Sequence, residues 1–134
     1  MGLSWKRIWG LLVLVFIVGC HDNGPIWKPL EVTVSAYNSV KSQTANNPRL
    51  AAWGDTLVPG EKSIAVSQDL IALGLGHMTK VRIEGLQGVY KVKDKMHGKW
   101  KNRIDIYMGN DIKQAKAWGI KKKVIYYAIE QPPE

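Results

Sequence analysis

The chain has 134 residues, of which 46% are hydrophobic, and a formal net charge of +8 at pH 7. This length is enough for one small domain and excludes a multi-domain architecture. Its single cysteine, Cys20, excludes an intramolecular disulfide bond.

The first residues have the features of a targeting segment. Lys6 and Arg7 precede an apolar run, residues 8–18, that is shorter than the about 20 residues a membrane-spanning helix requires. The run ends in Val-Gly-Cys, which resembles the lipobox of bacterial lipoproteins. We therefore expect residues 1–19 to be a lipoprotein signal peptide and Cys20 to be acylated, for example with palmitate. The alternatives are a stub of membrane helix or a buried strand with an incidental thiol.

A lipid anchor would fix where the protein works. The mature chain would lie outside the cytoplasm on a membrane, and His21, rather than Asp, after Cys20 favours the periplasmic face of the outer membrane in a Gram-negative cell. Loss of Lys6 and Arg7 would lower the formal charge from +8 to +6. That charge suits an anionic envelope polymer such as peptidoglycan. Nucleic acid is not an expected partner, because a domain held outside the cytoplasm seldom meets it.

Strand-like segments follow a predicted tether, residues 20–30, which contains Gly24, Pro25 and Pro29 and has no apolar period. Alternation of apolar and polar residues predicts six strands, at residues 31–37, 63–66, 80–83, 88–92, 104–108 and 122–128. A short helix is expected from Ser67 as its N-cap toward Gly74, and another from Asp111 to Trp118.

The remaining segments connect or extend these elements. Residues 38–61 contain Asn-Asn-Pro and Pro-Gly and predict an irregular loop, and residues 130–134 predict a flexible tail. Six short strands with turn signals and two small helices favour a closed barrel, which leaves no sheet edge exposed. The predicted fold class is therefore mainly β, with one barrel domain over residues 31–129.

Two aspartates stand in the basic stretch that holds the fourth and fifth of these strands. Alternation in residues 103–108 places Arg103, Asp105 and Tyr107 on the polar face, and Asp94 follows the strand before it. If the two strands are neighbours, both carboxyls meet at one groove, where a raised pKa would suit a general acid. Flanking cations would instead keep the carboxyls ionised, and a solvated surface ion pair is the alternative.

The pattern of these segments resembles the three-aspartate (3D) domain, a double-psi β-barrel found in membrane-bound lytic transglycosylase A and in small muralytic proteins. The resemblance covers residues 31–127 and rests on Val-Ser-Ala-Tyr at 34–37, Ile-Ala-Val at 64–66, Val-Lys-Asp at 92–94 and Ile-Asp-Ile-Tyr-Met-Gly at 104–109. It implies Asp105 as the general acid/base and Asp94 as a second groove aspartate. Ser67 stands where the family has its first aspartate.

The reaction implied by this resemblance is non-hydrolytic cleavage between N-acetylmuramic acid and N-acetylglucosamine. Asp105 would protonate the glycosidic oxygen, and the muramyl 6-hydroxyl would close a 1,6-anhydro ring. The alternatives are a non-catalytic peptidoglycan-binding module that uses the same groove, and an adaptor for another envelope protein.

Substrate contacts are expected from five residues of the same region. Lys95 and Arg103, with Trp100 between them, could hold an anionic glycan while the indole stacks on a sugar, and Tyr107 and Ser67 are included as groove residues. The alternative is a solvated turn with Trp100 packed inward. The three histidines lack ligand spacing, so neither a metal nor a cofactor is expected.

Overall fold

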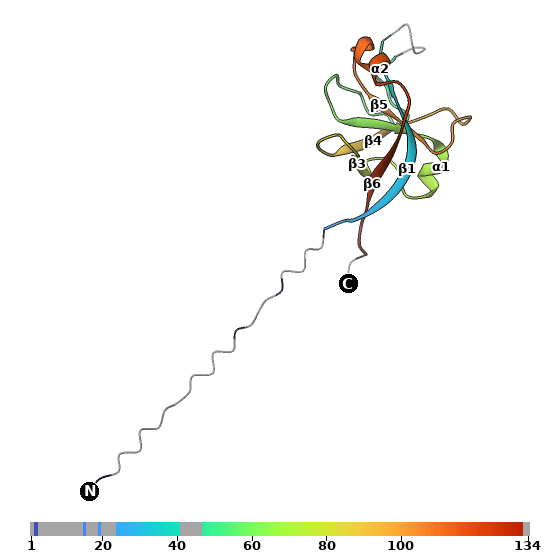
Figure 1. The fold of residues 1–134 in the computed structure, drawn as a ribbon. Helices are drawn as coiled ribbons and strands as arrows, with labels where there is room; N and C mark the ends of the chain where they lie inside the picture. Colours follow the sequence, from blue (N-terminus) through green and yellow to red (C-terminus); the bar gives the residue numbers. More distant parts are fainter. Residues whose placement is uncertain (1, 3–14, 16–18, 20–23, 41–46, 133–134) are drawn as a thin grey trace.

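The computed structural model describes residues 2, 15, 19, 24–40 and 47–132 (Figure 1). In chain order its elements are β1 (Ile26–Tyr37), β2 (Ser63–Val66), α1 (Gln68–Ala72), β3 (Lys80–Ile83), β4 (Tyr90–Lys95), β5 (Arg103–Tyr107), α2 (Ile112–Trp118) and β6 (Lys121–Ile129).

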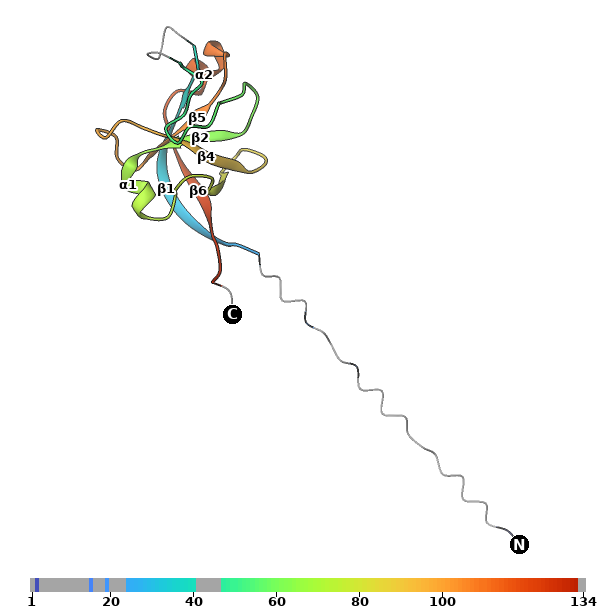
Figure 2. The ribbon, with the colours of Figure 1, turned by 180° about the vertical axis from the view of Figure 1, so that it is seen from behind.

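The six strands form one closed barrel in the order β1-β5-β2-β4-β3-β6. Figure 2 shows the same barrel from behind, with β2 labelled. β1 pairs with β5 and β2 with β4 in parallel, and the other four pairings are antiparallel. The predicted fold class is confirmed: a mainly β, closed six-stranded barrel with two short helices. The parallel pairs join strands that are not consecutive in sequence.

Strand alternation separates the barrel interior from its outer face. Val34 of β1, Ile64 of β2 and Ile104 of β5 are fully buried in one apolar cluster with side chains from the other three strands. In β5 the neighbours of Ile104, Arg103 and Asp105, are on the opposite face, because successive side chains of a strand alternate between its faces. β2 is buried on both faces. Burial of β-branched residues stabilises this pleated surface.

The start of β1 differs from the prediction. Residues 26–30, expected as part of the tether, belong to β1 and pair with residues 125–129 of β6. This segment was not predicted as a strand because a polar residue and a proline interrupt its apolar pattern. It extends past the barrel core and is largely exposed. Cys20 and nearly all of residues 1–19 lie outside the described residues.

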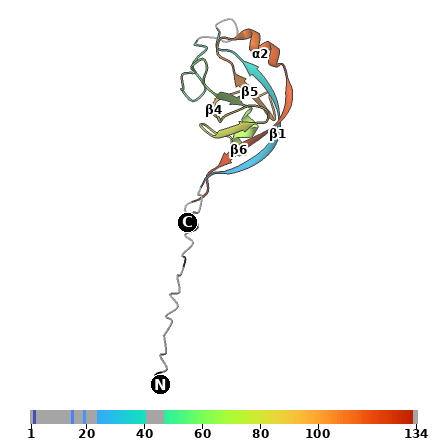
Figure 3. The ribbon, with the colours of Figure 1, turned by 60° about the vertical axis from the view of Figure 1, so that its left-hand side comes forward.

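Among the described residues, all strands and helices lie between Ile26 and Ile129, so the closed barrel includes none of the first 20 residues. In Figure 3 the start of β1 and the end of β6 lie at one pole, and α2 lies at the opposite pole. Over the described ranges, no helix combines the length and the apolar character needed to cross a membrane.

Both helices form close to where they were expected. The Asp111 side chain accepts a hydrogen bond from the Gln114 amide at 2.9 Å and caps α2. Ser67 precedes α1, but its side chain makes no cap hydrogen bond.

Candidate functional site

A row of four residues crosses four neighbouring strands on the outer face of the barrel. Strand register places Ser35 of β1 beside Asp105 of β5, Asp105 beside Ala65 of β2, and Ala65 beside Asp94 of β4. We call these four residues the aspartate row. Two strand spacings separate Asp94 from Asp105, roughly 10 Å between their Cα atoms. The structure therefore brings the two predicted aspartates to one face.

The Asp105 carboxylate is held by Ser35 and Arg103. The Ser35 hydroxyl donates a hydrogen bond to Asp105 Oδ1 and accepts hydrogen bonds from Arg103 Nε at 3.0 Å and Nη2 at 2.8 Å. Arg103 Nε lies 3.8 Å from Asp105 Oδ1, and both side chains are mostly buried, with 15% and 20% exposed. A guanidinium fixed in this way keeps the carboxylate in one place.

The environment of Asp105 affects its protonation in two opposing ways. Burial raises the pKa of the Asp105 carboxyl, while the Ser35 hydrogen bond and the Arg103 charge lower it, and burial has the larger effect. The pKa of Asp105 is therefore raised above the ordinary value. A carboxyl of this kind holds a proton to higher pH and can donate it to a ligand.

Trp100 contacts Arg103 and so lies beside the aspartate row. The Arg103 guanidinium lies 4.1 Å from the centroid of the half-buried Trp100 ring, and the Lys99 ammonium lies 5.0 Å from it. These cation–π contacts orient the indole beside Arg103. Lys95, at the end of β4, is exposed and lies over the Trp53 ring at 5.0 Å.

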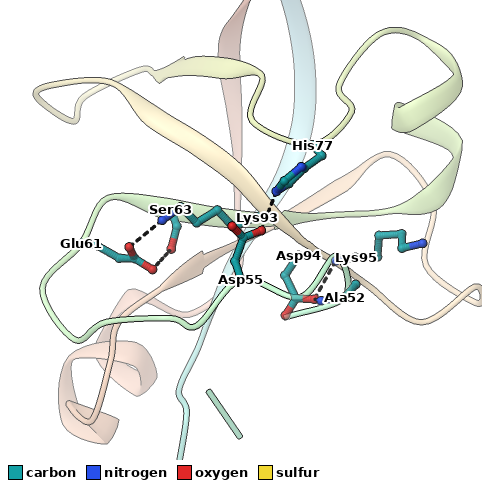
Figure 4. A network of polar contacts seen from close by, with 8 residues as sticks. All are labelled: Ala52, Asp55, Glu61, Ser63, His77, Lys93, Asp94 and Lys95. Carbon is teal, nitrogen blue, oxygen red and sulfur yellow. Dashed lines mark hydrogen bonds and ion pairs between the residues drawn. The ribbon is translucent and has the colours of Figure 1, made fainter. Parts of the chain in front are cut away.

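The Asp94 carboxylate binds a loop and does not form an open wall of the groove. Its Oδ1 accepts hydrogen bonds from the backbone amides of Ala52 and Lys95, both at 2.9 Å. Ala52 belongs to the segment 47–58, which we call the covering loop. Figure 4 shows this contact together with the hydrogen bond between His77 and Asp55, which holds the same loop at a second point. Asp94 therefore anchors the covering loop beside the row.

Two tyrosines lie beside the aspartate row. Tyr37 and Tyr107 are partners in the β1–β5 register, with ring centroids 5.5 Å apart. The Tyr107 hydroxyl shares a 2.6 Å hydrogen bond with Ser39 Oγ. Burial, and then the charges of Asp94 and Asp105, raise the pKa of Tyr37, and its buried hydroxyl has no hydrogen-bond partner within the described part of the chain. Tyr37 therefore stays protonated, as a donor beside both carboxyls.

Two of the predicted substrate contacts fall at positions that a ligand cannot reach directly. Ser67 is fully buried, and its Oγ accepts a hydrogen bond from the Arg103 amide at 3.0 Å. It therefore joins the end of β2 to the start of β5. Tyr107 is 4% exposed and packs against the Tyr37 ring. Lys95, Trp100 and Arg103 lie around the row.

Sequence reasoning did not assign Ser35 and Tyr37 to the site. Both lie on the polar face of β1, just as Asp105 and Tyr107 lie on the polar face of β5. The shared alternation was a visible signal, but the parallel β1–β5 pairing that brings these residues together was not. In the part of the chain that the structure describes, no three His, Cys, Asp or Glu side chains gather as metal ligands.

Comparisons with known proteins add little to this geometry. No protein family model matches the chain. No curated protein matches it. The likeness to three-aspartate domains therefore stays a prediction.

Two solved structures of an expansin from Clavibacter michiganensis resemble the chain. The apo expansin is 19% identical and has a TM-score of 0.49. A variant with an Asp-to-Asn substitution, in complex with cellohexaose, is 16% identical and also has a TM-score of 0.49. Each match covers 80% of this chain and 53% of the expansin, so the chain spans about half the length of these structures. At these values the likeness carries no argument about function.

Proposed function

We propose that this protein binds a polysaccharide of the cell envelope, with peptidoglycan as the first candidate, on the outer face around the aspartate row. The observation that carries the proposal is the fixed set Ser35, Asp105 and Arg103 with Trp100 stacked on the guanidinium. Sugars offer hydroxyl groups to such fixed polar atoms and apolar faces to an indole. Binding of this kind needs no bond to be cleaved.

The charge of the surroundings favours an anionic polymer. Lys95, Lys99 and Lys101 are exposed near the row, and the chain as a whole has a formal charge of +8. Attraction between this surface and carboxylates of the polymer would weaken as salt screens it.

Co-sedimentation with purified peptidoglycan tests the proposal, using the chain without residues 1–20. We expect Trp100→Ala to weaken binding about three- to tenfold, because an aromatic contact contributes about 0.5–1.5 kcal/mol. Arg103→Gln should weaken it further, because Ser35 and Trp100 both lose their partner.

A second Arg–Trp pair provides matched controls. Arg82 lies 4.3 Å from the Trp27 ring, away from the aspartate row. Trp27→Ala and Arg82→Gln should therefore bind as the parent does. Equal losses at the two pairs would show that the aspartate row is not the binding site.

A second candidate function is lytic transglycosylase-type cleavage, which the raised pKa of the half-buried Asp105 favours. Asp105 would donate a proton to the glycosidic oxygen as its bond to C1 breaks; the sugar's own 6-hydroxyl would then bond to C1 and give its proton to the Asp105 carboxylate. Asp94 would act through the covering loop that it anchors.

Mass spectrometry of fragments released from peptidoglycan separates the two candidates. Fragments with 1,6-anhydro ends that vanish in Asp105→Asn would establish cleavage. Sedimentation of both proteins with no released fragments would leave binding alone.

We also propose that Cys20 is acylated and anchors the barrel to a membrane, outside the cytoplasm. Only five residues separate Cys20 from Ile26, the first residue of β1. An anchored barrel would thus lie within about 20 Å of the membrane surface. Cys20→Ser should move the protein from the membrane to the soluble fraction, and an unchanged distribution would contradict the anchor.

A further inference from the structure

A pocket at the α2 pole of the barrel is separate from the aspartate row. It has a volume of about 630 Å³ and lies between α2, the end of β5 and the turns at residues 59–62 and 86–90. It contains none of the four residues of the row. This volume is in the range of sites that bind small molecules or short chain ends.

Two lysines, Lys62 and Lys121, line the pocket and bring ammonium groups to it. Lys62 Nζ lies 5.2 Å from the centroid of the Tyr90 ring, and Lys121 Nζ lies 4.0 Å from that of the Trp118 ring. Within the described residues, neither ammonium group forms a salt bridge to a carboxylate. Both are therefore available to an anion.

The acidic residues of the pocket are already engaged. Glu61 forms a 2.8 Å ion pair with Lys93 and accepts a hydrogen bond from Ser63 (Figure 4). It also accepts one from the Val58 amide. Asp111 caps α2 through the Gln114 amide. Within the described residues neither carboxylate pairs with Lys62 or Lys121, so both ammonium groups are left for a ligand.

The floor of the pocket is apolar. Leu86, Ile106 and Met108 line it, so a ligand with small aliphatic groups would bury them there. The rings of Tyr90 and Trp118 each have an ammonium group over one face. Ammonium groups beside an apolar surface favour a ligand that has a carboxylate and an aliphatic body.

We propose that this pocket binds the free C-terminal carboxylate of a short peptide. Lys62 and Lys121 would hold the carboxylate, and the aliphatic side chains would lie on Leu86 and Met108. The pocket is distinct from the aspartate row, so peptide binding here can be tested independently of the proposed polysaccharide binding.

Isothermal titration calorimetry with acetyl-Ala-Ala-Ala as the free acid, and with the same peptide amidated, tests the site. We expect the free acid to bind and the amide to bind at least tenfold more weakly. Lys62→Gln and Lys121→Gln should each raise the Kd of the free acid about tenfold. Lys122→Gln is the matched control and should leave the Kd within about twofold, since Lys122 lies outside the pocket.

NMR with the same peptide separates this pocket from the aspartate row. The amide signals of Gly109, Asn110 and Gln114 should shift, and those of Arg103 and Asp105 should not. Equal binding of the acid and the amide, or equal effects of Lys121→Gln and Lys122→Gln, would overturn the proposal. So would binding of an oligogalacturonate in the pocket where the peptide does not bind, which would assign the site to acidic sugars.

Discussion

At the scale of single residues, the Ser35 hydroxyl connects the charges of the site. It accepts two hydrogen bonds from Arg103 and donates one to Asp105. Removing it would leave two mostly buried guanidinium N–H groups without their acceptor. The position and the protonation of Asp105 therefore depend on a residue 70 positions away in sequence.

Ser35→Ala is expected to destabilise the fold by about 1–3 kcal/mol, because buried donors lose their partner. It should also raise the pKa of Asp105 further, since the Ser35 hydrogen bond lowers it. Urea unfolding measures the first effect, and ¹³C NMR titration of the carboxyl measures the second. A lower pKa in the variant would contradict the role assigned to Ser35.

Asp105→Asn is expected to change how stability depends on pH. Burial raises the folded-state pKa of Asp105 above its ordinary value, so the folded protein keeps this proton to higher pH than the unfolded chain does. The stability contributed by the protonated carboxyl is fully present below about pH 4 and is lost as pH rises through the raised pKa.

Asparagine cannot ionise, so the Asp105→Asn variant should not lose stability in this way as pH rises. The free energy of unfolding of the parent minus that of Asp105→Asn, measured in urea, should fall as pH rises from about 4. A difference that stays constant or rises with pH would mean that the folded state does not favour the protonated carboxyl.

At the scale of elements, the turn after β5 connects three segments. Gly109 has φ +54°, and its carbonyl oxygen accepts hydrogen bonds from the Ser39 amide at 3.0 Å and from Asn38 Nδ2 at 3.1 Å. A Cβ atom at Gly109 would lie 3.0 Å from Pro59 Cβ. The turn thus holds the end of β1 and the loop before β2 against β5.

Gly109→Ala is expected to lower the free energy of unfolding by about 1–3 kcal/mol, through the left-handed backbone and the contact with Pro59. Gly76→Ala is the matched control, because its Cβ would meet no atom within 4 Å and its φ is not positive. That variant should be neutral or up to about 1 kcal/mol more stable. Equal losses in thermal or urea unfolding would contradict the steric argument.

At the scale of the whole molecule, closure of the barrel makes every strand part of one core. Ile104 of β5 is fully buried between β1 and β2, which pair with β5 on its two sides. Ile120, in the turn before β6, is 68% exposed. Isoleucine-to-alanine substitution makes the same chemical change at both positions. A difference in the loss of stability therefore reports the burial of Ile104 in the barrel.

Ile104→Ala is expected to cost about 2–5 kcal/mol in urea unfolding, because it removes buried methylene groups and leaves a cavity. Ile120→Ala should change stability by no more than about 0.5 kcal/mol. A small loss at Ile104 would mean that the strands do not share one packed core.

The sequence by itself determined much of the local structure and the strand faces. Apolar and polar residues alternate in residues 31–37 and 103–108, which is enough to put Val34 and Ile104 inside and Asp105 outside, because the side-chain period of a strand is two. Asp111 at the start and Gly119 after Trp118 were likewise enough to locate α2. The start of β1 was missed, since its first residues are paired but not buried.

Only the tertiary structure decided which strands are neighbours, and with them the site. Parallel pairing of β1 with β5 sets Ser35 beside Asp105, and β2 places Ala65 between Asp105 and Asp94. No local pattern encodes this, because residues 70 apart come together only when the closed barrel satisfies the hydrogen bonds of all six strands at once. For the same reason Ser67, which looked like a groove residue, is buried: its hydroxyl is needed where β2 meets β5.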